Sequence, residues 1–358
     1  MESHLLLTGS TGTIGRLWLP LLLAADPSRY ITVLVRDPDQ TSKHPRVKVV
    51  NADLRITQLG LDRATWDSLA TTITEIVHCA ADIRFTRPIE DARAVNTAGT
   101  RTMLSLARQA TKLKRFAHLS TTYVMGRDQG ELPESQYCNS SGFVNTYEQA
   151  KYEAECEAFA AMPDIPTAVF RLSSVASTQS NYFDQALRLI PRNPFPLLPG
   201  VADCRVDLIS EAWAVATLSR LFERHFLPGA VYHVCAGPTA SIPVSNLLEL
   251  AFAAMGGGRP PAMVPLNDFE RFTAHFLGNG EREPIKAILR SVSSFLPHLA
   301  IDQAFQNAAT MALLKDDNVA LCHSSDVVRD VLARLNGHAD TSEPVDTVKL
   351  PPNTGPAA

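Results

Sequence analysis

Short apolar segments alternate with longer amphipathic ones through the first 125 residues of the chain. The short segments are rich in leucine, valine and isoleucine and read HLLLTG (4–9), YITVLVR (30–36), VKVVNADL (47–54), EIVHCAA (75–81) and RFAHLSTTYV (115–124). Segments with helical spacing lie between them, among them IGRLWLPLLLAA (14–25), DRATWDSLATTI (62–73) and NTAGTRTMLSLARQA (96–110). Strands that alternate with helices are typical of a parallel sheet with helices on both faces. The pattern therefore predicts an α/β fold with a doubly wound parallel sheet.

The pattern changes in the second half of the chain. The segment PRNPFPLLPG (191–200) is dense in proline, so we expect no regular structure there. AVYHVCAG (230–237) reads as a strand that returns to the main sheet, and helical spacing dominates residues 240–338. We therefore predict a main domain over residues 1–176 with 203–237 returning to it. A smaller, mainly helical region comprises 177–202 and 238–338, and 339–358 form a disordered tail.

Composition and charge narrow the class of protein. Hydrophobic residues make up 45% of the 358 residues and charged residues 20%, as in an ordinary globular protein. The formal net charge of -4 and the scattered basic residues argue against nucleic-acid binding. No apolar segment approaches the roughly 20 residues of a membrane span. The six cysteines form no C-x-x-C pair, and no basic stretch precedes the first apolar run. We therefore expect no zinc site, no signal peptide and a cytoplasmic location.

A glycine-rich loop follows the first predicted strand. LLLTGSTGTIGR places Gly9, Gly12 and Gly15 between that strand and a helix. In dinucleotide-binding folds the first glycine permits a tight turn, and the second lets the backbone approach a pyrophosphate. The third lets helix and strand pack closely. A purely structural turn is the alternative, but the motif has both the strand and the helix that dinucleotide binding requires.

The spacing of these glycines, with Thr8 ahead of them, resembles the T-G-x-x-G-x-x-G pattern of the extended short-chain dehydrogenase/reductase family. The resemblance implies a Rossmann fold that binds a nicotinamide cofactor in the main domain and a substrate in the helical region. It implies that Asp53 and Leu54 lie near the adenine, and that Ala80 and Ala81 lie on the nicotinamide side. From the loop itself it assigns to the cofactor Thr8, Gly9, Ser10, Thr11, Gly12, Thr13, Ile14, Gly15 and Arg16.

The end of the second predicted strand indicates which nicotinamide cofactor is bound. ITVLVR ends in Arg36, where an NAD-binding chain usually has an acidic residue on the ribose hydroxyl. An arginine there can pair with a 2'-phosphate, and Arg16 could add a second cation. Asp37 follows Arg36 and argues for NADH instead. We expect NADPH (NADP+).

Tyr147 and Lys151 stand four residues apart in NTYEQAKYEAE, which places them on one face of a predicted helix. Such a pair is common by chance on solvated helices. The family resemblance adds LSTTYVMG, similar to the family's strand-end segment, in which Thr121 matches the catalytic hydroxyl. The resemblance therefore implies the catalytic residues Thr121, Tyr147 and Lys151, with Tyr147 and Lys151 also contacting the cofactor.

These residue types suit the reduction of a carbonyl group. Hydride arriving at a carbonyl carbon leaves an alkoxide that must be protonated. A tyrosine has a pKa of about 10, too high for easy proton exchange near neutrality. We expect the ammonium of Lys151 to favour phenolate and so lower the pKa of Tyr147.

Several segments resemble one branch of the family, the thioester reductase domains and the fatty acyl-CoA reductases of the male sterility type. They read LGLDRATWDSLATTITEIVHCAADIRFTRP (59–88), VNTAGTRTMLSLA (95–107), NTYEQAKYEAE (145–155) and CRVDLISEAWAVATL (204–218). In that branch NADPH reduces an acyl thioester to an aldehyde, and some members continue to the alcohol. The resemblance implies an acyl thioester substrate on CoA or on a separate phosphopantetheine carrier protein. Ser68 in WDSL resembles a carrier attachment site, but we place it in an ordinary crossover helix.

Two other functions remain open at this stage. A carbonyl reductase that acts on a free aldehyde or ketone needs the same three catalytic residues and no carrier. A redox sensor that binds the dinucleotide without turnover needs the glycine-rich loop but neither Tyr147 nor Lys151. A sugar epimerase is disfavoured, because Arg36 favours a 2'-phosphate whereas such enzymes typically hold NAD.

Overall fold

A seven-stranded parallel sheet forms the centre of the protein. The structure is a computed structural model that describes residues 3–40, 44–178, 183, 187, 197–256, 258–278 and 296–337. The strand order is β12-β7-β5-β4-β1-β2-β3, and every neighbouring pair is parallel. The strands are β1 (His4–Thr8), β2 (Tyr30–Val35), β3 (Val47–Asn51), β4 (Glu75–His78), β5 (Arg115–Thr121), β7 (Thr167–Leu172) and β12 (Val231–Val234). This confirms the predicted doubly wound Rossmann sheet and the return of residues 230–237 to it.

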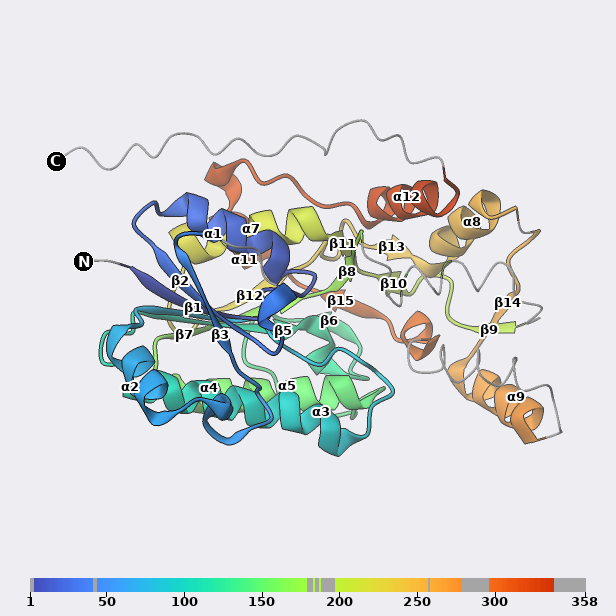
Figure 1. Cartoon of the computed structure of the whole chain (residues 1–358). Helices are drawn as coiled ribbons and strands as arrows, with labels where there is room; N and C mark the ends of the chain where they lie inside the picture. The colour runs from blue at the N-terminus through green and yellow to red at the C-terminus, as the bar shows by residue number, and fades with distance from the viewer. Residues whose placement is uncertain are drawn as a thin grey trace.

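Helices cover both faces of the sheet (Figure 1). One layer contains α1 (Gly15–Ala25) and α7 (Glu211–Arg224). The opposite layer contains α2 (Arg63–Thr72), α3 (Ile89–Val95), α4 (Thr97–Gln109) and α5 (Thr146–Ala161). Ser68 lies within α2, between β3 and β4, as expected for a crossover helix.

The apolar character of β1 follows from burial on both faces. Leu5 and Leu7 pack in one cluster with Trp18 of α1, whereas Leu6 packs in the opposite cluster with Trp66 of α2. Successive side chains of a strand point to opposite faces, so a central parallel strand needs apolar residues at consecutive positions. Continuous apolar runs were therefore the correct signal for this sheet.

The C-terminal region is mainly helical, as predicted, and much of it lies beyond the carboxyl ends of the strands, whereas residues 308–313 pack beside β12 (Figure 1). Its helices are α8 (Val244–Ala254), α9 (Leu266–Gly278), α11 (Ala308–Leu313) and α12 (Ser324–Leu335). Short 3₁₀ turns are η1 (Pro38–Gln40), η2 (Thr57–Gly60), η3 (Thr122–Met125), η5 (Leu296–Ala300) and η6 (Lys315–Asp317). None of the helices in the described part of the chain is long and apolar enough to cross a membrane.

Four two-stranded pairings connect distant segments around this region. The strands are β6 (Gly130–Leu132), β8 (Ser174–Ala176), β9 (Leu197–Pro199), β10 (Arg205–Val206), β11 (Leu208–Ser210), β13 (Ile242–Pro243), β14 (Ala262–Val264) and β15 (Gln303–Phe305). The prediction that 191–200 lacks regular structure is wrong at its end, where β9 pairs with β14. A short edge strand can contain a proline at its end, because the missing N–H of proline is not needed there. Residues 191–196 and the predicted tail 339–358 lie outside the described residues.

A buried ion pair joins α5 to the sheet. Arg171 of β7 lies 2.5 Å from the carboxylate of Glu155, and the two side chains are 0% and 2% exposed. Arg171 also donates to Nε2 of His233 at 3.1 Å, so the proton of this imidazole is on Nδ1, 2.7 Å from the carbonyl oxygen of Gln306. Burial and the nearby Arg171 lower the pKa of His233 to about 3, which keeps it neutral. The returning strand and the C-terminal region are thus connected to α5 by hydrogen bonds.

Candidate active site

The glycine-rich loop connects β1 to α1 at the point where the strand order reverses. Gly9 has a φ of +76°, and a Cβ there would lie 2.7 Å from the backbone nitrogen of Ala80. A Cβ on Gly15 would overlap the carbonyl oxygen of Gly9. Gly12 differs, because it is exposed and a Cβ there would meet only the Gly9 oxygen, at 3.4 Å. The fold itself thus requires glycine at 9 and 15, whereas the open side of Gly12 suits close approach by a ligand.

The loop before α1 and the start of this helix favour an anion. No side chain caps this helix, and its first turn contains no acidic residue. Thr11 is exposed, Thr13 is half-buried, and the Oγ of Ser10 is buried without a hydrogen-bond partner among the described residues. The N–H groups of Arg16 and Leu17 already donate to the carbonyl oxygens of Gly12 and Ile14, so an anion would be bound by donors of the loop before the helix, where the helix dipole favours negative charge. The loop therefore fits the pyrophosphate of a dinucleotide.

Thr8 fixes the segment that follows β4. Its Oγ1 accepts hydrogen bonds from the N–H groups of Cys79 at 3.2 Å and Ala80 at 3.1 Å. The same oxygen lies 2.9 Å from Nδ1 of His78. Since both lone pairs of the hydroxyl are used, its proton is donated to Nδ1 of His78.

His78 extends these hydrogen bonds to α4. Its proton must be on Nε2, which lies 3.0 Å from Oγ1 of Thr100, and Thr100 donates to the carbonyl oxygen of Asn96 at 2.7 Å. Burial lowers the pKa of His78 to about 3, so the ring stays neutral. The side chain of Asn96 bonds both the N–H and the carbonyl of Asp82, at 2.8 and 2.9 Å. The loop that contains Ala80 and Ala81 is therefore fixed at both ends.

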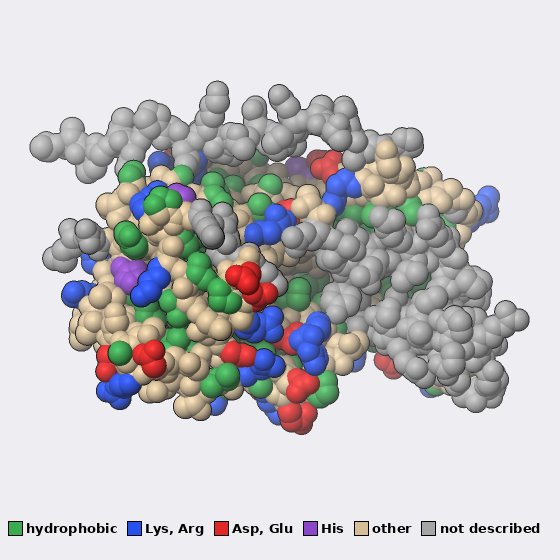
Figure 2. Space-filling model, viewed as in Figure 1, with side chains coloured by type: hydrophobic (Ala, Val, Ile, Leu, Met, Phe, Trp, Pro, Cys, Tyr) green, Lys and Arg blue, Asp and Glu red, His purple; other side chains and the backbone are tan. Residues whose placement is uncertain are grey.

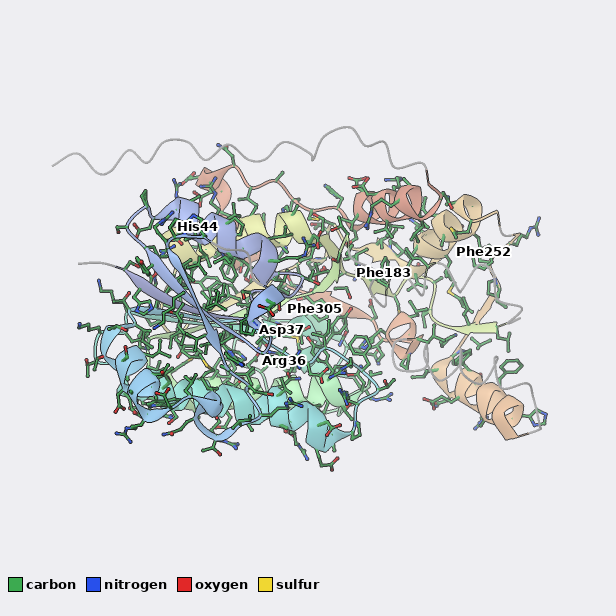
Figure 3. The ribbon with its side chains drawn as sticks, viewed as in Figure 1. Arg36, Asp37, His44, Phe183, Phe252 and Phe305 are labelled. Atoms are coloured by element: carbon green, nitrogen blue, oxygen red, sulfur yellow. The ribbon has the colours of Figure 1, made fainter. Side chains whose placement is uncertain are left out.

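Arg36 and Asp37 lie next to each other past the end of β2 (Figure 3). Arg36 is exposed and has no hydrogen-bond or ion-pair partner in the part of the chain that the structure describes. Asp37 accepts a hydrogen bond from the N–H of Asp39 at 3.2 Å, at the start of η1. The cation is thus more available to a ligand than the carboxylate, in accord with the expected 2'-phosphate.

Asp53 and Leu54 follow β3 at the same edge of the sheet. Arg55 pairs with Asp53 at 2.5 Å and is the main cause that lowers the pKa of Asp53, to which nearby Arg36 adds. Leu54 packs on α4, where a Cβ on Gly99 would lie 3.0 Å from it. Contact of the two residues with an adenine stays a prediction.

Arg16, predicted as a second cation for the 2'-phosphate, instead pairs with a carboxylate of the protein. Its guanidinium is 2.6 Å from the carboxylate of Glu211 and donates to Thr178 at 3.2 Å. An arginine in this ion pair connects α1 to α7 and is not free to act as a second cation on a 2'-phosphate. The partner lies 195 positions away, so the local sequence could not indicate it.

Thr121, Tyr147 and Lys151 come together at the carboxyl end of β5. Thr121 is the last residue of that strand, and its hydroxyl is a hydrogen-bonding partner of the Tyr147 phenol. Nζ of Lys151 donates to the carbonyl oxygen of Leu119 in β5 at 2.7 Å. Lys151 is buried and Tyr147 half-buried. The three predicted catalytic residues therefore form one cluster.

The start of α5 places Tyr147 within this cluster. Asn145 caps the helix, with its Oδ1 accepting from the N–H of Glu148 at 3.0 Å, and Glu148 accepts in return from the N–H of Val144 at 2.9 Å. Thr146 donates to the carbonyl oxygen of Arg87 at 2.7 Å. These bonds fix the first turn of the helix, in which Tyr147 is the second residue.

An aromatic loop approaches Tyr147 from the other side. The ring of Phe85 lies 5.5 Å from that of Tyr147, and the carbonyl oxygen of Phe85 accepts from Thr146 at 3.3 Å. Phe85 lies within the quoted segment 59–88, and sequence reasoning assigned it no contact. The pair shields one side of the phenol from water.

Burial has the largest effect on the pKa values of Tyr147 and Lys151. It raises the pKa of Tyr147 above its ordinary value, against the hydrogen bond from Thr121 and with a further rise from Glu148. It lowers the pKa of Lys151 to about 8, opposed by Glu155. The expected lowering of the tyrosine pKa is therefore not met in the protein alone, because desolvation is the larger effect. At neutral pH Tyr147 keeps its proton, as a proton donor must.

Opposite charges alternate around the edge of this site. The ion pairs are Arg55–Asp53 at 2.5 Å, Arg84–Asp82 at 2.5 Å and Arg87–Asp91 at 3.4 Å. Figure 2 shows basic and acidic side chains interspersed on the lower part of this face. Among the described residues no group of His, Cys, Asp or Glu is arranged to hold a metal ion.

Residues 39–190 match the NAD-binding family model described as "Male sterility protein". The fatty acyl-CoA reductase 1 of Gallus gallus is 31% identical over 144 residues, which cover 34% of this chain and 28% of that protein. The chain therefore spans less than a third of the length of the curated relatives that it matches. The resemblance indicated by the motifs is confirmed over this segment.

Two solved structures show the same fold over nearly the whole chain. The terminal R domain from the myxalamid PKS-NRPS biosynthetic pathway has a TM-score of 0.74 and 21% identity, covering 95% of this chain and 92% of that one. UDP-glucuronic acid 4-epimerase from Bacillus cereus, solved in complex with NAD, has a TM-score of 0.64 and 16% identity, covering 93% and 99%. At these identities the likeness establishes the fold and no more.

Two glycine substitutions separate folding from dinucleotide binding. We expect Gly15→Ala to destabilise the protein strongly, because the methyl group would overlap Gly9. Gly12→Ala has room in the protein, so its melting temperature should stay close to that of the wild type while its affinity for the dinucleotide falls at least tenfold. Thermal melting and titration of the cofactor by fluorescence measure the two effects. Wild-type affinity in Gly12→Ala would remove this loop from the binding site.

Proposed function

We propose that this chain, whose residues 39–190 match the male sterility type of NAD-binding domain, is an NADPH-dependent reductase of acyl thioesters. The observation that carries the proposal is the cluster of Thr121, Tyr147 and Lys151 beside a dinucleotide loop. The kinship of the same segment with fatty acyl-CoA reductases favours a thioester over other carbonyl substrates. The epimerase likeness concerns the fold, which hosts unrelated reactions.

Three parts of the chain would bind the cofactor. The loop around Gly12 would take the pyrophosphate, Arg36 would take the 2'-phosphate, and the loop of Ala80 and Ala81 would lie on the nicotinamide side. Lys151 uses one of its three N–H donors on Leu119, which leaves two for the ribose. When bound, the reduced nicotinamide supplies the hydride.

Tyr147 would then protonate the substrate oxygen. Thr121, its hydrogen-bonding partner, orients the carbonyl oxygen toward the phenol. Because burial raises the pKa of Tyr147, the phenol carries the proton that the nascent alkoxide needs. Lys151, with a pKa of about 8, is largely an ammonium at neutral pH and stabilises the phenolate that remains.

The product of this step on a thioester is a hemithioacetal. Its carbon–sulfur bond breaks as its hydroxyl proton is lost, the sulfur gains a proton, and an aldehyde and a thiol leave. A second NADPH would supply the hydride, and the same residues the proton, to convert the aldehyde to an alcohol. The thiol belongs to CoA or to a carrier protein. The carrier partner and a cytoplasmic location stay predictions.

A carbonyl reductase acting on free aldehydes or ketones is the second candidate, because the same cluster performs the same proton transfer. A dinucleotide-binding sensor is less well supported. Such a protein has no need of a buried lysine beside a phenol that bonds a threonine.

Replacement of the proton donor tests the mechanism. Tyr147→Phe removes the phenolic proton but keeps the ring that contacts Phe85. We expect turnover to fall about 10²–10⁴-fold, the usual contribution of general acid catalysis, while cofactor binding stays within a fewfold of wild type. Steady-state kinetics and fluorescence titration provide the two values. Unchanged turnover would exclude Tyr147 as the proton donor.

Replacement of Arg36 tests the choice of cofactor. Arg36→Ala removes the exposed cation past β2, so NADPH affinity should fall about tenfold or more while NADH affinity changes little. Arg63→Ala is a matched control, because Arg63 is an exposed arginine paired with Asp67 on α2. Titrations of both variants with both cofactors give the comparison. Equal losses for NADPH and NADH in Arg36→Ala would contradict a role in 2'-phosphate recognition.

A further inference from the structure

The residue that follows Tyr147 contacts the C-terminal region. Nε2 of His298 in η5 lies 2.7 Å from Oε1 of Glu148, with side-chain exposures of 9% and 1%. The two residues are 150 positions apart in the chain. A buried contact between the first turn of α5 and η5 thus connects the predicted substrate region to the helix of the proton donor.

The carboxylate of Glu148 accepts three hydrogen bonds. Oε2 accepts from the N–H of Val144 at 2.9 Å, and Oε1 accepts from Nδ2 of Asn145 at 2.8 Å as well as from His298. An ionised carboxylate only accepts hydrogen bonds, so Nε2 of His298 carries a proton. A buried carboxylate that loses one donor retains its desolvation cost without compensation, and the first turn of α5 must then rearrange.

The other side of the His298 ring lies against the strand end that bears Thr121. The ring centroid is 4.6 Å from that of Tyr123, two residues after Thr121. The hydroxyl of Tyr123 is 2.8 Å from Oγ of Ser174 in β8. His298 therefore contacts the neighbours of both Tyr147 and Thr121, on two elements that are separate in sequence.

We propose that His298 is a positioning residue, which acts through Glu148 to set Tyr147 against Thr121. The proposal rests on the proposed reductase function. Turnover then depends on the contact of η5 with α5, because the region predicted to bind substrate also positions the phenol of Tyr147. Removal of the Nε2 donor displaces the phenol and lowers turnover, whereas the dinucleotide loop on β1 and α1 is unaffected.

Two amide substitutions at His298 test this dependence. In His298→Gln the amide nitrogen can occupy the place of Nε2 and donate to Glu148. In His298→Asn the same amide is one methylene shorter and does not reach. The matched control is His225→Asn, because Nε2 of His225 donates to the carboxylate of Asp317 at 2.5 Å, between α7 and η6.

The measurements are kcat, the KM for the thioester, the Kd for NADPH and the melting temperature of each variant. We expect His298→Asn to lower kcat about 10- to 100-fold, the scale of a displaced catalytic group, with an unchanged Kd for NADPH. His298→Gln should recover kcat to within about threefold of the wild type. His225→Asn should keep wild-type kcat even if its melting temperature falls.

The outcomes separate this inference from the proposed function. If the wild type turns over no thioester or aldehyde, the proposed function fails and the inference fails with it. If the wild type is active and His298→Asn keeps its kcat, the inference alone is wrong. Equal kcat losses in His298→Asn and His298→Gln, or failure of His298→Asn to fold, would show a purely structural role and also overturn it.

Discussion

The site depends on how closely α5 approaches the sheet. The buried side of this helix, which packs on α4, β5 and β7, includes Ala150, Ala154, Ala158 and Ala161, none of which has exposed surface. Methyl side chains permit a short distance between helix and sheet, and only at that distance does Lys151 reach the carbonyl oxygen of Leu119. A larger residue on this face would move the helix outward and separate Tyr147 from Thr121. The alanine face is thus a geometric requirement of the proposed chemistry.

Buried polar contacts then hold α5 and the loop after β4 in place around the site. Arg171 and Glu155 hold the middle of α5 to the sheet, and Glu155 also opposes the fall in the pKa of Lys151 that burial causes. Thr8 and His78 fix the loop after β4 on the cofactor side. Both histidines of these networks, His78 and His233, are neutral, with pKa values of about 3. These two histidines therefore add no charge to the site, and the charged groups of these networks are Lys151 and the Arg171–Glu155 pair.

The fold and the central part of the site could be predicted because their signals are local. Continuous apolar runs identify central parallel strands, and the spacing of the glycines and of Tyr147 and Lys151 is visible in short segments. The partners that position these residues could not be predicted in the same way. Arg16 pairs with Glu211, and Glu148 with His298, across 195 and 150 positions. His78 stood in a quoted motif, but its role follows only from the hydrogen bonds to Thr8 and Thr100. The lowered pKa expected for Tyr147 is not met in the protein alone, because desolvation by burial raises this pKa and the sequence gives no measure of burial.

The most direct test of the account is NADPH consumption by the whole chain with acyl-CoA thioesters and with the matching free aldehydes, with released thiol assayed in parallel. The account predicts NADPH consumption with the thioesters and one free thiol for each thioester consumed. Consumption with aldehydes alone, without thiol release, would contradict the thioester reading and assign the chain to the carbonyl reductases.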